Sequence, residues 1–527
     1  MRKLLAALST AGLLAIAWPA NGSLTPLVFG AFIPMLWLEK VIRLSDSKHR
    51  GRQLFFYAWL SFGLFNLGTT WWVSYAHWSG TAATTIVNGG LMAFCFWLFH
   101  IVSRNLGAAK GLILLPFLWM PVEYLHMDWD MSFPWLNLGY VFANRPSWIQ
   151  WYSYSGIWGG TLWVLWVNAI LFRSFLPSQP KATVISWVLK SIFIIGIPVG
   201  VSHWMYAHYE EVGRPVNVVS VQPNLDPYSV KFTLDDEETV DRFISFAKPY
   251  LSDSTDYLIG PETMIGKGRL NEATLSYTRA IQKLQHLSDS LPKLRTVIGL
   301  SSHLRYRSKE TETARPLGNN GGYVDQFNTS IQIGPTGMEI PRYHKSKLVV
   351  GVEKVPFKWL FEPLLAGGID LGGATGTLGG QTDRAVFTRE MDSSVIATPV
   401  CWEADFPGYT AEFVRNGAQA LFAITNDGWW NDTPGKTQHM YYASVRAIEN
   451  RRDVVRSANT GISCYINQRG DISHQIPYET DGAFAAVVYL NDELTLFTKS
   501  GDVGGRISIF ISIAVLLSIV VKLRTGR

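Results

Sequence analysis

The hydrophobic positions of this chain follow two different patterns. Long apolar runs fill residues 1–205 and return at 506–523, whereas residues 206–505 alternate short apolar runs with polar stretches. A helix needs about 20 mostly apolar residues to cross a bilayer. Runs of about this length lie at roughly 3–19, 24–42, 54–75, 84–103, 109–126, 156–175, 184–205 and 506–523. The pattern therefore predicts a membrane bundle of about eight transmembrane helices, seven before residue 205 and one at 506–527, together with a separate domain at 206–505.

The basic residues beside these runs predict their orientation. The loop after the second run carries Lys40, Arg43, Lys48, Arg50 and Arg52. Two short loops on the other side of the predicted spans, 20–23 and 76–83, contain no Lys, Arg, Asp or Glu. Because loops rich in Lys and Arg stay in the cytoplasm, we expect both chain termini there and the domain 206–505 on the opposite face of the membrane.

Residues 1–22 allow a second interpretation. Arg2 and Lys3 precede a short apolar core that ends in Trp-Pro-Ala-Asn-Gly-Ser, as in a cleaved signal peptide. Removal of this segment would leave the later spans in place. The large domain would therefore lie on the same face under either interpretation.

Composition agrees with a chain of two parts. Of the 527 residues of the chain, 48% are hydrophobic and 21 are Trp, and such a chain is too apolar for an ordinary soluble enzyme. The mean hydropathy of +0.10 is too low for a pure membrane bundle. The net charge of +5 reflects mainly the basic loops, so it does not indicate a nucleic-acid partner. Three cysteines, Cys95, Cys401 and Cys464, are too few and too scattered to suggest a disulfide framework.

The domain at 206–505 reads as an α/β fold. The strands we predict lie at 216–221, 256–259, 296–300, 326–333, 394–400, 421–425, 461–467 and 484–490. The helices we predict lie at 235–249, 271–289 and 437–451. Strands interleaved with helices are typical of a layered α/β domain.

Three residues at the edges of these strands could form one reactive site. Glu262 follows the strand at 256–259, Lys345 lies between two strands, and Cys401 ends the strand at 394–400. A cysteine attacks an acyl carbon as a thiolate, so it needs a base or a positive charge nearby. Glu262 can act as the base, and Lys345 can favour the thiolate and stabilise the oxyanion together with a backbone N–H beside Cys401. Glu353, eight residues after Lys345, could orient the lysine.

Each of these residues also has a purely structural explanation. A cysteine at a strand end often only packs, a glutamate after proline can cap a helix, and a loop lysine is usually solvated. The ordered set of Glu262, Lys345 and Cys401 is more specific than any one of its members.

The motifs around this set resemble a known superfamily. Pro-Glu-Thr (261–263), Tyr-His-Lys (343–345) and Cys-Trp-Glu (401–403) are similar to the carbon–nitrogen hydrolases, or nitrilases. Ile-Thr-Asn-Asp-Gly-Trp-Trp (424–430) and Phe-Pro-Trp-Leu-Asn-Leu-Gly-Tyr (133–140) resemble, within that superfamily, the bacterial apolipoprotein N-acyltransferase family. The resemblance implies an αββα sandwich for 206–505 in addition to the membrane helices.

The resemblance also implies a reaction. An acyl chain would pass from the sn-1 position of a phospholipid to a thioester on Cys401, and then to the α-amino group of an N-terminal diacylglyceryl-cysteine. The acceptor would be an apolipoprotein, and the ping-pong reaction would be the last step of lipoprotein maturation. The implied setting is the bacterial inner membrane, with the catalytic domain on the periplasmic side. No cofactor and no metal are implied, and we expect a monomer.

The family's residue roles transfer only where the motifs match. The residues concerned are Glu262, Lys345 and Cys401 as catalytic groups, Glu353, Trp402 and Glu403 as supporting groups, and Gln222, Phe232, Asn426 and Trp429 as substrate-binding groups. The chain departs from the family pattern in the loop between Lys345 and Glu353, which reads Ser-Lys-Leu-Val-Val-Gly-Val, and at Phe232, which stands where a tryptophan is usual. The aromatic contact is kept there, but the indole N–H is missing.

Two other functions remain open at this stage. A membrane-anchored amidohydrolase could use the same three residues on a small amide, with water as the final acceptor. A non-catalytic membrane protein could keep the sandwich only as a binding module. The intact set of Glu262, Lys345 and Cys401 argues against the second of these.

Overall fold

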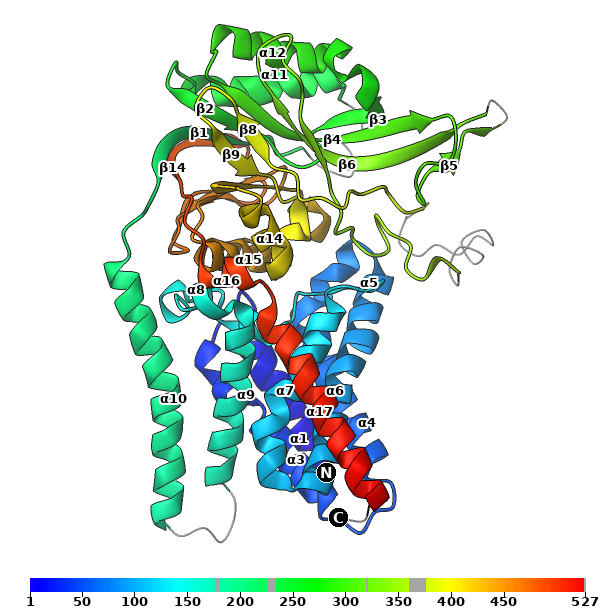
Figure 1. Ribbon diagram of the computed structural model, residues 1–527, viewed down its shortest axis with the longest axis vertical. Coiled ribbons are helices and arrows are strands. Elements are labelled where there is room, and N and C mark those ends of the chain that lie inside the picture. Colours follow the sequence, from blue (N-terminus) through cyan, green and yellow to red (C-terminus); the bar gives the residue numbers. More distant parts are fainter. Residues whose placement is uncertain (176–180, 226–233, 319–320, 360–375, 526–527) are drawn as a thin grey trace. The chain divides into compact units, whose positions relative to one another are not determined.

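The structure, a computed structural model, describes residues 1–175, 181–225, 234–318, 321–359 and 376–525. The chain forms two compact units, and each is considered by itself. The first unit combines Met1–Tyr209 with Ser500–Arg527, and the second is Glu210–Lys499. The first is helical and the second contains sheets and helices (Figure 1).

The helical unit contains both long and short α-helices. They are α1 (Arg2–Ala17), α2 (Val28–Ala31), α3 (Ile33–Arg43), α4 (Arg50–Thr70), α5 (Trp78–Ala83), α6 (Gly89–Leu106), α7 (Ala108–His126), α8 (Tyr152–Ser155), α9 (Ile157–Ser174), α10 (Lys181–His208) and α17 (Val503–Thr525). Aromatic rings pack its interior: Phe32 stacks on Phe96 at 6.0 Å, and Trp119 meets Phe32 edge-on at 5.5 Å.

Five helical segments of the described chain are long and apolar enough to cross a membrane. They are Thr25–Arg43, Trp78–Leu106, Ala108–His126, Thr183–His208 and Val503–Thr525. This is the helical unit of a membrane protein. The other predicted spans, at 3–19, 54–75 and 156–175, are also helical as α1, α4 and α9 but are not among the five. The helix α1 has only 16 residues, and α4 begins with the polar run Arg-Gly-Arg-Gln, so a total of eight spans stays a prediction.

The second unit contains two sheets. The strands of the first are β1 (Arg214–Gln222), β2 (Thr255–Ile259), β3 (Ile265–Asn271), β4 (Arg295–Tyr306), β5 (Arg315–Pro316), β6 (Tyr323–Ile333), β7 (Arg342–His344) and β14 (Gly482–Leu490). The strands of the second are β8 (Phe387–Arg389), β9 (Ser394–Ala397), β10 (Ala420–Thr425), β11 (Val454–Ala458), β12 (Ser463–Ile466) and β13 (Ile472–Ile476).

Helices cover the outer faces of both sheets (Figure 1). Those of the second unit are α11 (Asp236–Ala247), α12 (Arg279–Ser290), α14 (Pro407–Arg415), α15 (Pro434–Asn450) and α16 (Leu496–Ser500). The helices α11 and α12 lie on the first sheet, and α15 lies on the second. The sheets meet face to face, where the rings of Tyr257 and Phe422 pack edge-on at 5.2 Å. The predicted α/β fold with two layers of sheet between helices is therefore confirmed.

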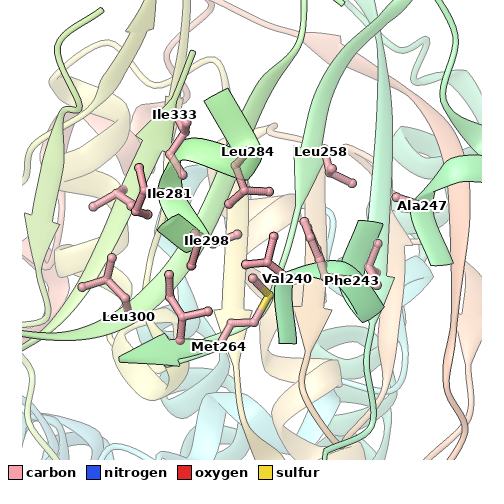
Figure 2. Packing of buried hydrophobic residues seen from close by; sticks show 14 of the residues in the cluster. Val240, Phe243, Ala247, Leu258, Met264, Ile281, Leu284, Ile298, Leu300 and Ile333 are labelled. Atoms are coloured by element: carbon pink, nitrogen blue, oxygen red, sulfur yellow. The ribbon is translucent and has the colours of Figure 1, made fainter. Parts of the chain in front are cut away.

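Apolar side chains bind α11 and α12 to the first sheet. Val240 and Phe243 from α11, and Ile281 and Leu284 from α12, are fully buried against strand residues such as Ile298 (Figure 2). The four helix residues recur at spacings of three, which places them on one face of each helix. The burial of these apolar side chains stabilises the packing of both helices on the sheet. This packing fixes the end of β2, which Glu262 follows.

One local prediction was wrong, and several strands were not predicted. A single helix was expected over 271–289, but the structure has a 3-10 turn at Glu272–Tyr277 and then α12 from Arg279. The reason is that the Asn271 side chain caps Ala273 at 3.1 Å and Thr278 is extended, which ends one helix and begins the next. The strand β11 was not predicted, although it is the central partner of β10 and β12.

Candidate active site

The backbone holds Cys401 in an unusual conformation. Cys401 begins the short 3-10 helix η9 (Cys401–Asp405) after β9, and its φ is +55°. A non-glycine residue in this left-handed region costs about 1–3 kcal/mol and persists only where its surroundings enforce it. The Glu403 carboxylate accepts a 2.9 Å hydrogen bond from the N–H of Val400, just before the cysteine. This contact ties the turn down and leaves Cys401 8% exposed.

Glu262 belongs to the first sheet, where its backbone passes close to Gly299. It follows β2, and its backbone passes so close to β4 that a Cβ on Gly299 would lie 2.7 Å from Glu262 Cα. Only glycine permits this approach. The Glu262 side chain is buried, and its Oε1 accepts hydrogen bonds from Asn328 Nδ2 at 2.7 Å and Lys345 Nζ at 3.0 Å.

Lys345 lies between two carboxylates. Its Nζ is 3.0 Å from Glu262 Oε1 and 2.9 Å from Glu353 Oε2, and the residue is 1% exposed. Burial acts to lower the pKa of Lys345, but the charges of Glu262 and Glu353 outweigh it, so the pKa lies well above its usual value. The lysine is therefore a buried cation throughout the physiological pH range.

Cys401 is electrostatically coupled to both of these groups. Burial raises the pKa of the Cys401 thiol well above its usual value, and the Glu262 charge adds to the shift, while Lys345 opposes it. The resting protein consequently holds a thiol and not a thiolate. A thiolate has to be generated during the reaction, by a group that can accept the proton.

Asn328 links the charged groups to one another. It comes from the middle of β6, and its Nδ2 donates to Glu262 Oε1 and also to Glu353 Oε1 at 3.0 Å. Its backbone carbonyl accepts from the N–H of Lys345 at 2.8 Å. Glu353 itself is held by the N–H of Val349, which donates to Oε2 at 2.9 Å. The arrangement fixes both carboxylates on either side of the lysine.

Glu403 connects the cysteine turn to the lysine loop. Its side chain lies within hydrogen-bonding distance of five donor groups: Val400 N, Ser346 N, Lys347 N, Tyr343 Oη and Tyr409 Oη. The neighbouring Trp402 donates from Nε1 to the carbonyl of Lys347 at 2.6 Å. Both residues therefore hold the segment after Lys345 against the segment that carries Cys401.

Such a buried set of carboxylate, lysine and thiol can form and break an acyl–sulfur bond, which is chemistry shared by several families. The model of the carbon-nitrogen hydrolase family matches residues 217–492, more than half of the chain. The chain belongs to the carbon-nitrogen hydrolase family. The model of the apolipoprotein N-acyltransferase N-terminal domain matches residues 10–170. Within the carbon-nitrogen hydrolases, this pair of matches confirms the predicted resemblance to the apolipoprotein N-acyltransferases.

Full-length relatives agree with this assignment. An apolipoprotein N-acyltransferase of Chlorobaculum tepidum is 26% identical over 498 residues, which cover 93% of this chain and 92% of that protein. One of Geobacter metallireducens is 26% identical over 519 residues, covering 95% and 92% respectively. Among solved structures, Saccharomyces cerevisiae Nit3, a member of branch 10 of the nitrilase superfamily, matches with 15% identity and a TM-score of 0.38, over 55% of this chain and 95% of that chain.

The predicted substrate-binding residues of this carbon-nitrogen hydrolase have different surroundings. Asn426 is buried, and its Oδ1 accepts from Asn459 Nδ2 at 3.3 Å; Trp429 is half-buried in the next turn. Gln222 donates to the carbonyls of Pro477 and Thr480 and accepts from Ser463. Both ends of the Gln222 amide thus contact the domain itself, and the structure does not bring it to Cys401. Phe232 lies outside the described residues.

Several residues of the site were not predicted. The first is Asn328. The others form a buried polar group on the side of Cys401: Thr425, Asp427, His439 and Arg456. Asp427 contacts both His439 Nδ1, at 3.0 Å, and Arg456 Nη2. The available signal was a polar residue inside or directly after an apolar strand, as at Asn328 in Gln-Phe-Asn-Thr-Ser-Ile-Gln-Ile.

Proposed function

We propose that the protein transfers an acyl chain from the sn-1 position of a phospholipid to the α-amino group of the N-terminal diacylglyceryl-cysteine of an apolipoprotein. The observation that carries the proposal is the buried contact of Lys345 with Glu262 and Glu353, electrostatically coupled to a buried thiol, on a chain that also contains a membrane unit. The names of the relatives support the same function.

In the first half-reaction, Cys401 acquires the acyl chain. Glu262 takes the thiol proton, and the sulfur attacks the ester carbonyl of the phospholipid. Lys345, with a backbone N–H beside Cys401, stabilises the oxyanion of the tetrahedral intermediate. Collapse of the intermediate breaks the ester C–O bond, and the proton on Glu262 passes to the departing lysophospholipid. The product is a thioester on Cys401.

In the second half-reaction, the amine replaces the sulfur. The α-amino group of the lipoprotein attacks the thioester carbon, and Glu262 takes a proton from the attacking nitrogen. Collapse breaks the C–S bond, and the same proton returns to sulfur to regenerate the thiol. The thioester has to persist between the two halves, so water must be kept from it. The burial of Cys401, Glu262 and Lys345 is consistent with that need.

Glu353, Trp402 and Glu403 would act in support. Glu353 and Asn328 keep Lys345 directed at Glu262, while Glu403 and Trp402 hold the cysteine turn and the lysine loop together. Asn426 and Trp429 would shape the acyl pocket. Gln222 would help indirectly, because its amide joins β1 to the loop after β13 and to β12.

The proposal includes a topology and an assembly. The membrane unit would comprise residues 1–205 and 506–527 with eight spans, and the catalytic domain would be 206–505. Both termini would lie in the cytoplasm and the domain on the periplasmic face of the inner membrane. A monomer would suffice, since Glu262, Lys345 and Cys401 all come from one chain. Both substrates are lipid-anchored, so a site held at the membrane would meet them by diffusion in two dimensions.

The test compares two acceptors. Full-length protein in vesicles receives a phospholipid labelled in its sn-1 chain and a diacylglyceryl lipopeptide with a free α-amino group. The expected products are a labelled N-acyl lipopeptide and an equal amount of lysophospholipid, while the same lipopeptide with an acetylated amine accepts nothing. Release of labelled free fatty acid, at a rate independent of the amine, would instead support a hydrolase acting with water.

A further inference from the structure

The strand register places Thr425 beside the cysteine. Val400 and Ile424 form a bridge in parallel strands, and the N–H of Ile424 donates to the carbonyl of Pro399 at 3.2 Å. The next residues along the two strands are Cys401 and Thr425, which therefore lie at the same sheet edge. Thr425 is fully buried, and its hydroxyl lies close enough to the Cys401 sulfur to act to lower the pKa of the thiol.

The same hydroxyl has a second partner. Thr425 Oγ1 donates to Asp427 Oδ1 at 3.0 Å. Asp427 is fully buried, and burial alone would raise its pKa, but Arg456 and His439 lower the pKa to about 2. The carboxylate is therefore ionised and can only accept hydrogen bonds. A threonine hydroxyl has one hydrogen, so it cannot donate to Asp427 and to the sulfur at once.

We propose that Thr425 is a positioning residue for Cys401, whose single hydroxyl hydrogen turns from Asp427 to the sulfur when the thiol loses its proton. The proposal rests on the function proposed above. While Cys401 is a thiol, the hydroxyl donates to Asp427 and its oxygen is free to accept from the S–H group. When Glu262 takes the thiol proton, the hydroxyl rotates and donates to the thiolate. Thr425 keeps its own hydrogen throughout, so no proton passes through it.

Asp427 has other partners that remain when the Thr425 hydroxyl turns away. It keeps contacts with His439 Nδ1 and Arg456 Nη2 after the hydroxyl turns away. His439 also lies 3.8 Å from Asp405, which places a second carboxylate behind the first. The charged groups that act on the sulfur are then Glu262 and Asp427, which disfavour the thiolate, and Lys345 and Arg456, which favour it. Donation from Thr425 adds to the favourable side at the stage when the thiolate exists.

The test measures the reactivity of the thiol without any lipid. Well below its pKa, a cysteine is alkylated in proportion to its thiolate fraction. We compare iodoacetamide labelling of Cys401, by peptide mass spectrometry, in the full-length wild type and three variants from pH 7 to 9.5. Thr425→Val removes the hydroxyl and keeps the shape, and Thr425→Ser keeps the hydroxyl. Thr296→Val is the matched control, a buried threonine whose hydroxyl has no hydrogen-bond partner in the described part of the chain.

A hydrogen bond to a charged group is worth enough to slow labelling roughly ten- to a hundred-fold in Thr425→Val. Thr425→Ser and Thr296→Val should stay within about threefold of the wild type, by the same reasoning. Equal rates in Thr425→Val and the wild type, or an equal loss in Thr425→Ser, would overturn the proposal.

A folding defect in Thr425→Val would expose Cys401 and speed its labelling, so it cannot imitate the slowing that we expect. Asp427→Asn replaces the charged acceptor by a neutral amide oxygen and removes a negative charge, so labelling of Cys401 should become faster. Slower labelling in a variant that keeps its cooperative thermal transition would also overturn the proposal. Because no lipid is present, these results stand whether or not the protein proves to be an acyltransferase.

Discussion

Two buried glutamates of the α/β unit, Glu262 and Glu403, have opposite surroundings. Glu403 lies within hydrogen-bonding distance of five donor groups. Glu262, in the described part of the chain, has two: Asn328 Nδ2 and Lys345 Nζ. Through these contacts Glu403 joins the cysteine turn to the lysine loop, and each of its two oxygens accepts at least one hydrogen bond. Both contacts of Glu262 are made by Oε1, so its Oε2 can take a proton. The difference fits a structural role for Glu403 and a chemical role for Glu262.

The largest expected effect comes from removing the proton acceptor. Glu262→Gln keeps the size of the side chain and can still accept from Lys345, but an amide does not take a proton from the thiol. General-base catalysis typically contributes about 10²–10⁴-fold, so the rate of thioester formation should fall by that factor. The rate is measured by incubating the protein with acyl-labelled phospholipid and quenching the reaction at a series of times. An unchanged melting temperature is the required control. A fall of less than tenfold in the rate of thioester formation would mean that Glu262 has a structural role like that of Glu403.

The next largest effect should be on stability. Glu403→Leu removes the acceptor that these five donors share, and a buried donor left without a partner costs about 1–3 kcal/mol. Thermal unfolding of the detergent-solubilised protein should shift down by several degrees, and Cys401 should become more accessible to alkylation as its turn loosens. Tyr409→Phe, which removes one of the five donors, is the milder partner. If Glu403→Leu melts like the wild type, the comparison between the two glutamates fails.

Acid should weaken the pocket behind the cysteine through Asp427. The folded-state pKa of Asp427 is about 2, below its usual 3.8, so its contribution to stability is present above about pH 4 and is lost as the pH falls towards 2. Unfolding measured between pH 5 and pH 2.5 should show this loss in the wild type. Asp427→Asn should be less stable at pH 5 and should have a shallower acid dependence. Parallel curves for the two proteins would contradict the buried ion pair with Arg456.

The smallest effect tests a single hydrogen bond. Trp402→Phe keeps an aromatic ring beside Phe406 but removes the donor to the carbonyl of Lys347. The loss should be about 1 kcal/mol of unfolding free energy and a few-fold in the acylation rate. Denaturant unfolding and the same labelling assay measure both. A loss as large as that of Glu262→Gln would mean that Trp402 contacts the substrate.

The sequence predicted the parts of the site that depend on strand ends. Glu262 and Cys401 each follow an apolar segment, Lys345 directly follows β7, and residues at the edges of strands can meet in a sandwich. Asn328 and Thr425 were not predicted, because their roles depend on strand pairing. The register of β6 against β4 places Asn328, and the bridge between Val400 and Ile424 places Thr425. The contact of Asp427 with Arg456 joins residues from two strands whose pairing no local pattern shows.

The same limit explains the mistaken or open predictions. The helix expected at 271–289 has the right apolar spacing, but an Asn271 cap and an extended Thr278 divide it, and these are local details that periodicity does not register. Gln222 is predicted to bind substrate, and this prediction stays open; in the structure its amide contacts Pro477, Thr480 and Ser463. A polar residue at a strand end can serve either purpose, and only its partners decide.

The central claim is that Cys401 carries the acyl chain as a thioester. Full-length protein in vesicles is incubated with phospholipid labelled in the sn-1 chain and without an amine acceptor, then digested and analysed by mass spectrometry. The account predicts one labelled peptide, containing Cys401, whose label is released by neutral hydroxylamine and is absent in Cys401→Ala. Equal labelling of Cys401→Ala, or a label that hydroxylamine does not release, would contradict it.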